Sequence, residues 1–90
     1  SEMCIRDRNE IMKIINEWDP ISFFPMAPKD EYINEITKIY NLMISERGIQ
    51  PERLAQAINE IFIATFGNDV YEENIVECRE VANKLVKIVL

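Results

Sequence analysis

Few residues of this chain have the types and spacing that catalysis requires. The 90-residue sequence contains no histidine, which removes the commonest general base, the commonest metal ligand and the usual partner of a nucleophilic serine. Its few serines stand outside any nucleophile-elbow pattern, and its two glycines do not form a phosphate-binding loop. No run of carboxylates has the spacing of a calcium loop. We therefore expect a protein that is not an enzyme and that binds no cofactor and no metal.

Three carboxylates near the C-terminal end are the nearest approach to a reactive cluster. Glu73, Glu77 and Glu80 are spaced i, i+4, i+7, which predicts one face of a helix. An acid/base or metal site would need further partners from another helix. The simpler interpretation is a solvated helix face, although neighbouring like charges cost a few tenths of a kcal/mol. The alternative is a surface that meets a basic partner.

The segment from Trp18 to Tyr32 combines aromatic side chains, prolines and acidic residues. Pro20, Pro25 and Pro28 stiffen it, and such a length is unusual for a loop in a small helical domain. Its apolar side chains either fold over the helices and complete a small core, or remain exposed as a docking surface. We predict a partner-binding surface here or on the acidic helix face. Its candidate residues are Asp19, Phe23, Phe24, Met26, Asp30, Glu31, Tyr32, Glu73, Glu77 and Glu80.

The two cysteines do not form a metal-ligand cluster. Cys4 and Cys78 are expected to be free thiols, which favours a reducing cytoplasm. Cys78 falls on an apolar helical stripe and is expected to be a buried, unreactive thiol. No apolar run reaches about 18 residues and no signal-peptide pattern is present, so neither a membrane span nor export is expected.

Hydrophobic periodicity predicts an all-α fold of four short helices in one domain. The expected ranges are about 7–18, 30–46 and 51–66, followed by a helix that begins between 71 and 74. Pro20, Gly48, Pro51 and Gly67 mark their boundaries. No window has the alternation of a β-strand. We expect a single-domain four-helix array over residues 9–90, with a long, apolar, proline-rich loop between the first two helices.

The first eight residues are expected to carry little information about function. Ser1 and Glu2 resemble a tag remnant ahead of Met3. The run from Met3 to Arg8 resembles the translation of a transposon-end adapter used for sequencing libraries. We therefore treat residues 1–8 as an extension and leave them out of the functional argument.

Several of these segments also carry a family resemblance. The motif Trp18-Asp19-Pro20-Ile21, the segment Pro28–Tyr32, and the later Ile61-Phe62 with Phe66-Gly67 resemble the YugE-like family of small bacterial proteins, domain of unknown function 1871. The resemblance extends from about Ile11 to Leu85 and does not include the residues before Asn9. It implies an all-helical, four-helix, cytoplasmic protein, and it supplies no activity, cofactor or catalytic residue.

Charge narrows the kinds of partner that the protein can have. Sixteen Asp plus Glu against ten Lys plus Arg give a net charge of −6, which opposes direct binding of nucleic acid. A small, acidic, helical chain is typical of a protein-binding module, such as an immunity or antitoxin-type inhibitor of a basic toxin. The alternative is a phage or bacterial-defence protein that sequesters a nucleotide signal, with Trp18, Phe23, Phe24 or Tyr32 stacking on the base. Only Lys29 lies near these rings in sequence to meet phosphates.

Overall fold

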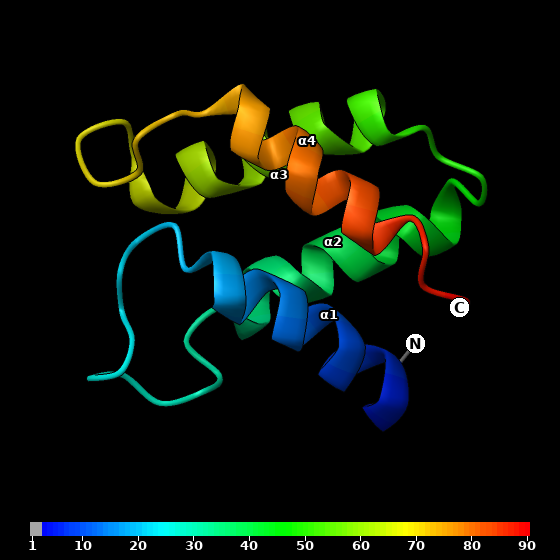
Figure 1. Cartoon of the computed structure of the whole chain (residues 1–90), viewed down its shortest axis with the longest axis horizontal. Coiled ribbons are helices and arrows are strands. Elements are labelled where there is room, and N and C mark those ends of the chain that lie inside the picture. Colours follow the sequence, from blue (N-terminus) through cyan, green and yellow to red (C-terminus); the bar gives the residue numbers. More distant parts are fainter. Residues whose placement is uncertain (1–2) are drawn as a thin grey trace.

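The computed structural model describes residues 3–90 and contains four α-helices (Figure 1). These are α1 (Ile5–Trp18), α2 (Ile33–Ser45), α3 (Pro51–Phe66) and α4 (Ile75–Leu85). The described residues include no strand, so the predicted all-α fold is confirmed. No helix within residues 3–90 has the length and apolar character needed to cross a membrane.

The helix boundaries follow local sequence chemistry. Pro51 occupies the first turn of α3, where its missing N–H costs no hydrogen bond. Asn74 caps α4, because its side-chain oxygen accepts a hydrogen bond from the backbone N–H of Glu77 at 3.1 Å. Gly67 ends α3 with φ of +78°, a conformation that an L-residue rarely adopts.

Two helices begin elsewhere than the sequence predicts. The first starts earlier, at Ile5, because the Cys4 sulfur accepts a hydrogen bond from the Asp7 N–H at 3.4 Å. The second starts later, at Ile33, because the Asp30 carbonyl accepts from the Ile33 N–H at 3.0 Å and holds a separate turn. Ser1 and Glu2 lie outside the described residues, whereas the rest of the proposed extension includes the first turn of α1.

The helices pack in a ring in which each contacts its two neighbours, α1 with α2 and α4, and α3 with α2 and α4. In Figure 1, α1 and α4 lie in front of α2 and α3, and the segment 19–32 loops out on the left. The fully buried side chains come from all four helices and from the two longer connections. The largest are Tyr32, Tyr71, Phe62, Ile11, Ile15, Ile36, Ile39, Leu54, Ile58, Leu85 and Cys78.

Candidate functional site

The carboxylate of Asp19 organises the loop that follows α1. Asp19 has φ of +45° and is the C-terminal cap of the helix. One carboxylate oxygen accepts from the Phe23 N–H at 2.9 Å and from the Tyr32 hydroxyl at 2.5 Å, and the other accepts from the Phe24 N–H at 3.1 Å. Partial burial opposes ionisation, but these hydrogen bonds outweigh it and hold the pKa of the Asp19 carboxyl below its usual value. Asp19 therefore fixes the loop, and its oxygens are largely engaged within the chain.

Tyr32 was predicted to contact a partner, and the structure contradicts this. Its side chain is fully buried, with its ring against Phe23, Phe24, Phe62 and Phe66. Burial, together with the hydrogen bond to Asp19, raises the pKa of its hydroxyl. Tyr32 therefore belongs to the hydrophobic core and supports the loop from the inside.

The other apolar loop residues divide between core and surface. Phe23 and Phe24 are half-buried and pack against the core, whereas Met26 is 93% exposed. Phe24 borders a shallow hollow with Lys13, Asn16, Glu17 and Lys29. Of the carboxylates predicted to group with Phe24, Asp19 is hydrogen-bonded to its backbone N–H, whereas the hollow beside the Phe24 ring is not lined by Asp30 or Glu31. Asp30 and Glu31 are exposed in the turn before α2.

Trp18 joins this loop to the first turn of α4. Its indole ring packs edge-on against Phe62, with ring centres 5.1 Å apart, and against Tyr71 at 6.4 Å. Its N–H donates a hydrogen bond to a carboxylate oxygen of Glu77 at 2.9 Å. The side chain remains half-buried, so one part of the indole supports the core while another part faces the surface.

Two adjoining hollows flank Trp18 and bring together three of the predicted acidic residues, Asp19, Glu77 and Glu80. One, of about 280 Å³, is lined by Glu17, Trp18, Glu77, Glu80, Val81 and Lys84. The other, of about 300 Å³, is lined by Trp18, Asp19, Glu72 and Glu77. We name this surface the Trp18 patch, and its members are Trp18 with the five carboxylates of Glu17, Asp19, Glu72, Glu77 and Glu80. From the sequence, the loop and the acidic helix face were two alternative binding surfaces. In the folded protein, Asp19 of the loop and Glu77 of the helix line the same hollow.

Glu73 was predicted on the same helix face as Glu77, and this prediction is wrong. Because Asn74 caps α4, Glu73 precedes the helix, and it accepts a hydrogen bond from the Asn59 amide on α3 at 3.0 Å. The Asn59 carbonyl oxygen in turn accepts from the Tyr71 hydroxyl at 2.8 Å. Glu73 therefore belongs to a structural network between α3 and the segment before α4.

Cys78 is buried at the end of that network, as predicted. Its sulfur lies 3.3 Å from the Tyr71 hydroxyl, and both Cys78 and the exposed Cys4 are free thiols. Burial raises the pKa of the Cys78 thiol, so the protonated, weakly nucleophilic form is favoured. Within residues 3–90, no group of three or more histidine, cysteine or carboxylate side chains is placed to hold a metal ion.

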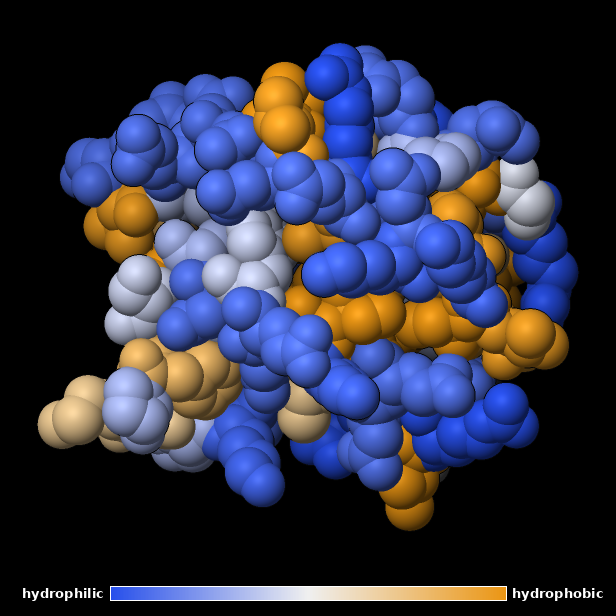
Figure 2. Space-filling model, in the orientation of Figure 1, coloured by the Kyte–Doolittle hydropathy of each residue, from blue (hydrophilic) through white to orange (hydrophobic). Residues whose placement is uncertain are grey.

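The sequence did not reveal that basic residues also gather on the α1–α4 face. Arg6, Lys13, Lys84 and Lys87 line one groove of about 490 Å³, together with Glu10 and Glu17. The apolar side chains of Ile14, Ile88 and Val89 complete this groove. Figure 2 shows this side of the molecule, where a strip of apolar atoms runs between hydrophilic rows. We name this surface the basic groove. Lys13 is 71 residues from Lys84 in sequence, so their proximity is visible only in the folded chain.

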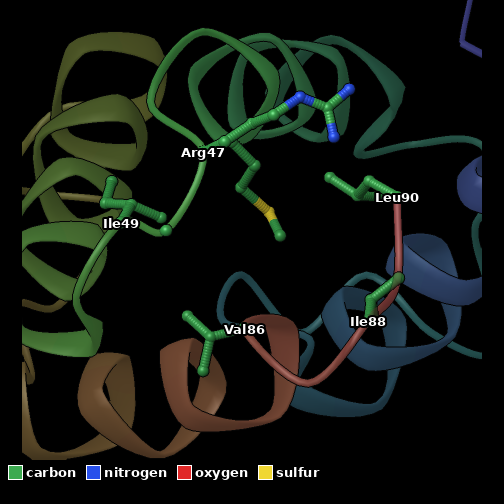
Figure 3. A pocket seen from close by; sticks show the side chains of 7 residues that line it. Arg47, Ile49, Val86, Ile88 and Leu90 are labelled. Atoms are coloured by element: carbon green, nitrogen blue, oxygen red, sulfur yellow. The ribbon is translucent and has the colours of Figure 1, made fainter.

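A separate apolar pocket of about 140 Å³ lies at the end of the helix ring. Figure 3 shows it between the end of α2 with the following connection on one side and the C-terminal segment on the other. Met43, Ile49, Val86, Ile88 and Leu90 supply most of its lining, and Arg47 is its one charged residue. This lining offers packing but no nucleophile, base or paired polar groups, so the acidic and basic surfaces of the α1–α4 face are the better candidates for function.

Comparison with known proteins agrees with the motifs around this site. The chain matches a family model described as Domain of unknown function (DUF1871) over residues 10–89. That range includes the Trp18-Asp19-Pro20 motif and the whole Trp18 patch. No curated protein and no solved structure matches the chain. Because the matched range covers most of its length, this protein belongs to the DUF1871 family.

Proposed function

We propose that this protein is a non-catalytic protein-binding module whose Trp18 patch docks onto a basic surface of a partner protein. The observation that carries the proposal is the convergence of five carboxylates, from α1, the following loop, the segment before α4 and α4 itself, around one half-buried tryptophan. Tryptophan is among the residues that most often dominate binding energy, and surrounding charges steer association.

The geometry of the patch suits recognition of positive charge. Glu72 and Glu80 are exposed, and among the described residues neither side chain forms an ion pair or hydrogen bond. Glu77 is oriented by the Trp18 N–H, so its other carboxylate oxygen is presented in a defined direction. Asp19 is held by the loop and contributes charge more than free hydrogen-bonding capacity. A partner that presents lysine or arginine side chains would complement this arrangement.

An inhibitor of a basic toxin, of the immunity or antitoxin type, is the most specific form of this proposal. Such inhibitors gain fast association from opposite charge. Both free cysteines are compatible with a reducing compartment, so we also propose a cytoplasmic location. Sequestration of a nucleotide signal has less support, because the rings of Phe23 and Tyr32 pack on one another and carboxylates beside Trp18 would repel phosphates.

The experiment compares affinity capture by three forms of the immobilised protein in a bacterial lysate. These are the wild type, Glu72→Lys/Glu80→Lys in the patch, and Glu60→Lys/Asp69→Lys, at two exposed residues outside the patch, as a control with the same change in net charge. We expect the wild type and the control to retain the same basic proteins, identified by mass spectrometry, and the patch variant to lose them. Each captured protein is then purified and titrated against the three forms by calorimetry.

Two results would overturn the proposal. Retention of a directly binding partner by the patch variant would place the binding site elsewhere. Equal loss in both variants would show that capture reflects net charge alone. Co-purification of a nucleotide-like molecule with the wild type, in place of a protein, would favour the sequestration alternative.

A further inference from the structure

The charges on the α1–α4 face are separated along the two helices. α1 ends at Trp18 beside the first turn of α4, because the Trp18 N–H reaches Glu77. Further back along α1, Lys13 shares the basic groove with Lys84 and Lys87 at the other end of α4. The two helices are therefore antiparallel, and one end of their shared face is acidic while the other is basic.

The acidic and basic ends belong to one continuous surface. Glu17 and Lys84 line both the basic groove and the adjoining hollow of the Trp18 patch. They therefore mark the boundary at which the sign of charge changes. Four of the ten basic residues of an acidic protein line this one groove, so positive charge is concentrated here.

Within the described chain, one of the four basic residues of the basic groove forms an ion pair. Arg6 pairs with Glu10 at 3.7 Å, across exposed side chains. Lys13, Lys84 and Lys87 are exposed and form no ion pair within the described chain. Beside them, Val89 is 78% exposed and adds apolar surface to the groove. Exposed apolar area beside unpaired lysines is typical of an interface that a complementary surface covers.

We propose that a second copy of this chain covers the face, with the two copies related by a twofold axis near Glu17 and Lys84. Rotation by half a turn about an axis that lies in the interface plane and runs across α1 and α4 turns the second copy to face the first and exchanges its ends. The Trp18 patch of each copy then meets the basic groove of the other, and both contacts form in one closed dimer. This inference does not depend on the proposed function, because it requires only that the two ends attract one another.

Net repulsion between the copies opposes this contact only weakly in physiological salt. Each copy carries a net charge of −6. At an ionic strength of about 0.15 M, interactions between exposed charges are screened beyond about 8 Å. Opposite charges that meet in the interface act at shorter range, so the local complementarity prevails. We expect a weak dimer that dissociates in high salt.

The test uses two charge-reversal variants and their mixture. Lys84→Glu/Lys87→Glu makes both ends of the face acidic. Glu72→Lys/Glu80→Lys leaves three carboxylates and two lysines in the Trp18 patch, which removes most of its attraction for the basic groove. Each variant alone is expected to dimerise at least about tenfold more weakly than the wild type. An equimolar mixture of the two is expected to recover a heterodimer. The unchanged Trp18 patch of one variant then meets the unchanged basic groove of the other, and the new glutamates meet the new lysines.

Analytical ultracentrifugation from about 10 µM to about 1 mM protein measures the result. Lys38→Glu/Arg47→Glu, which changes two exposed residues at α2, is the control and is expected to dimerise like the wild type. A wild type that stays monomeric, a mixture that associates no better than its components, or growth beyond a dimer would overturn the inference. None of these results affects the proposed partner site, since capture of a basic partner does not require the basic groove.

Discussion

The hydrogen bonds of Asp19 allow a quantitative prediction about the loop after α1. Replacing Asp19 by Asn preserves the size of the side chain and its tolerance of a positive φ. The amide oxygen can still accept from the Phe23 N–H and the Tyr32 hydroxyl, but the amide nitrogen would face the Phe24 N–H and cannot accept. The variant therefore loses one hydrogen bond and the charge that strengthens the other two.

The expected cost follows from the difference between charged and neutral hydrogen bonds. A bond to a charged group contributes about 1.5–3 kcal/mol, and a neutral one about 0.5–1.5 kcal/mol. Two bonds weakened by about 1–1.5 kcal/mol each and one lost bond of about 1.5–3 kcal/mol sum to about 3.5–6 kcal/mol, and solvent screening around the half-buried Asp19 reduces this to about 2 kcal/mol. We therefore expect Asp19→Asn to lower the free energy of unfolding by about 2 kcal/mol, which shifts the melting temperature by roughly 8–16 °C.

The cost should depend on pH in a defined direction. The pKa of the Asp19 carboxyl is lowered in the folded protein. Its contribution is therefore fully present above its unfolded pKa of about 3.9 and is lost as pH falls through the folded value. Urea denaturation of the wild type and Asp19→Asn should show a gap at pH 7 that narrows below about pH 4.

Asp30→Asn is the matched control, because Asp30 lies in the same loop with an exposed side chain. We expect its midpoint to stay within about 0.5 kcal/mol of the wild type. The reasoning is refuted if Asp19→Asn costs no more than this control. It is equally refuted if the gap is the same at pH 3 and pH 7.

Three further substitutions test the core around the site. Trp18→Ala should cost about 3 kcal/mol in urea denaturation, because the indole packs edge-on against Phe62 at 5.1 Å, and an unchanged midpoint would show that the ring adds nothing to the core. Glu35→Gln should stabilise the protein by about 1 kcal/mol at pH 7, since the side chain is 2% exposed with one oxygen unpartnered. Burial raises the pKa of Glu35, so the wild type loses stability as pH rises through that value, and the advantage of the variant should vanish below about pH 4. Tyr71→Phe should lower the thermal midpoint by the equivalent of about 1 kcal/mol through loss of its 2.8 Å bond to Asn59, and an unchanged midpoint would remove that bond from the account.

Local signals were sufficient to predict the helices. Pro51 and Gly67 mark the ends of α3 where the sequence placed them, since proline and glycine act through their own backbone geometry. The start of α2 was less predictable. Asp30 and Glu31 have the residue types of a first helical turn, yet the Asp30 carbonyl closes a separate turn and the next residue but one, Tyr32, is buried in the core, so that α2 begins at Ile33.

The grouping of the site residues could not be predicted without the fold. The residue types of Asp19 and Glu77 were sufficient to mark both as acidic candidates, but their proximity depends on α1 and α4 being antiparallel. The same arrangement produces the basic groove, since Lys13 and Lys84 have no relation in sequence. Glu73 does not lie on the helix face for a local reason. Asn74 caps α4, so the helix begins after Glu73 even though the spacing of the glutamates fits a helix.

The most direct measurement of the central claim is site-specific photocrosslinking from the Trp18 patch. p-Benzoylphenylalanine replaces Glu80 in the patch or, as a control, the exposed Asn41 on α2, and each form is irradiated in bacterial cells that express it. A heavier adduct that contains only this chain reports the dimer, and an adduct with a different protein reports a partner. The account predicts that position 80, and not position 41, crosslinks to a basic partner protein. Crosslinking of such a partner from position 41 with none from position 80 would contradict the claim that the Trp18 patch is the binding surface.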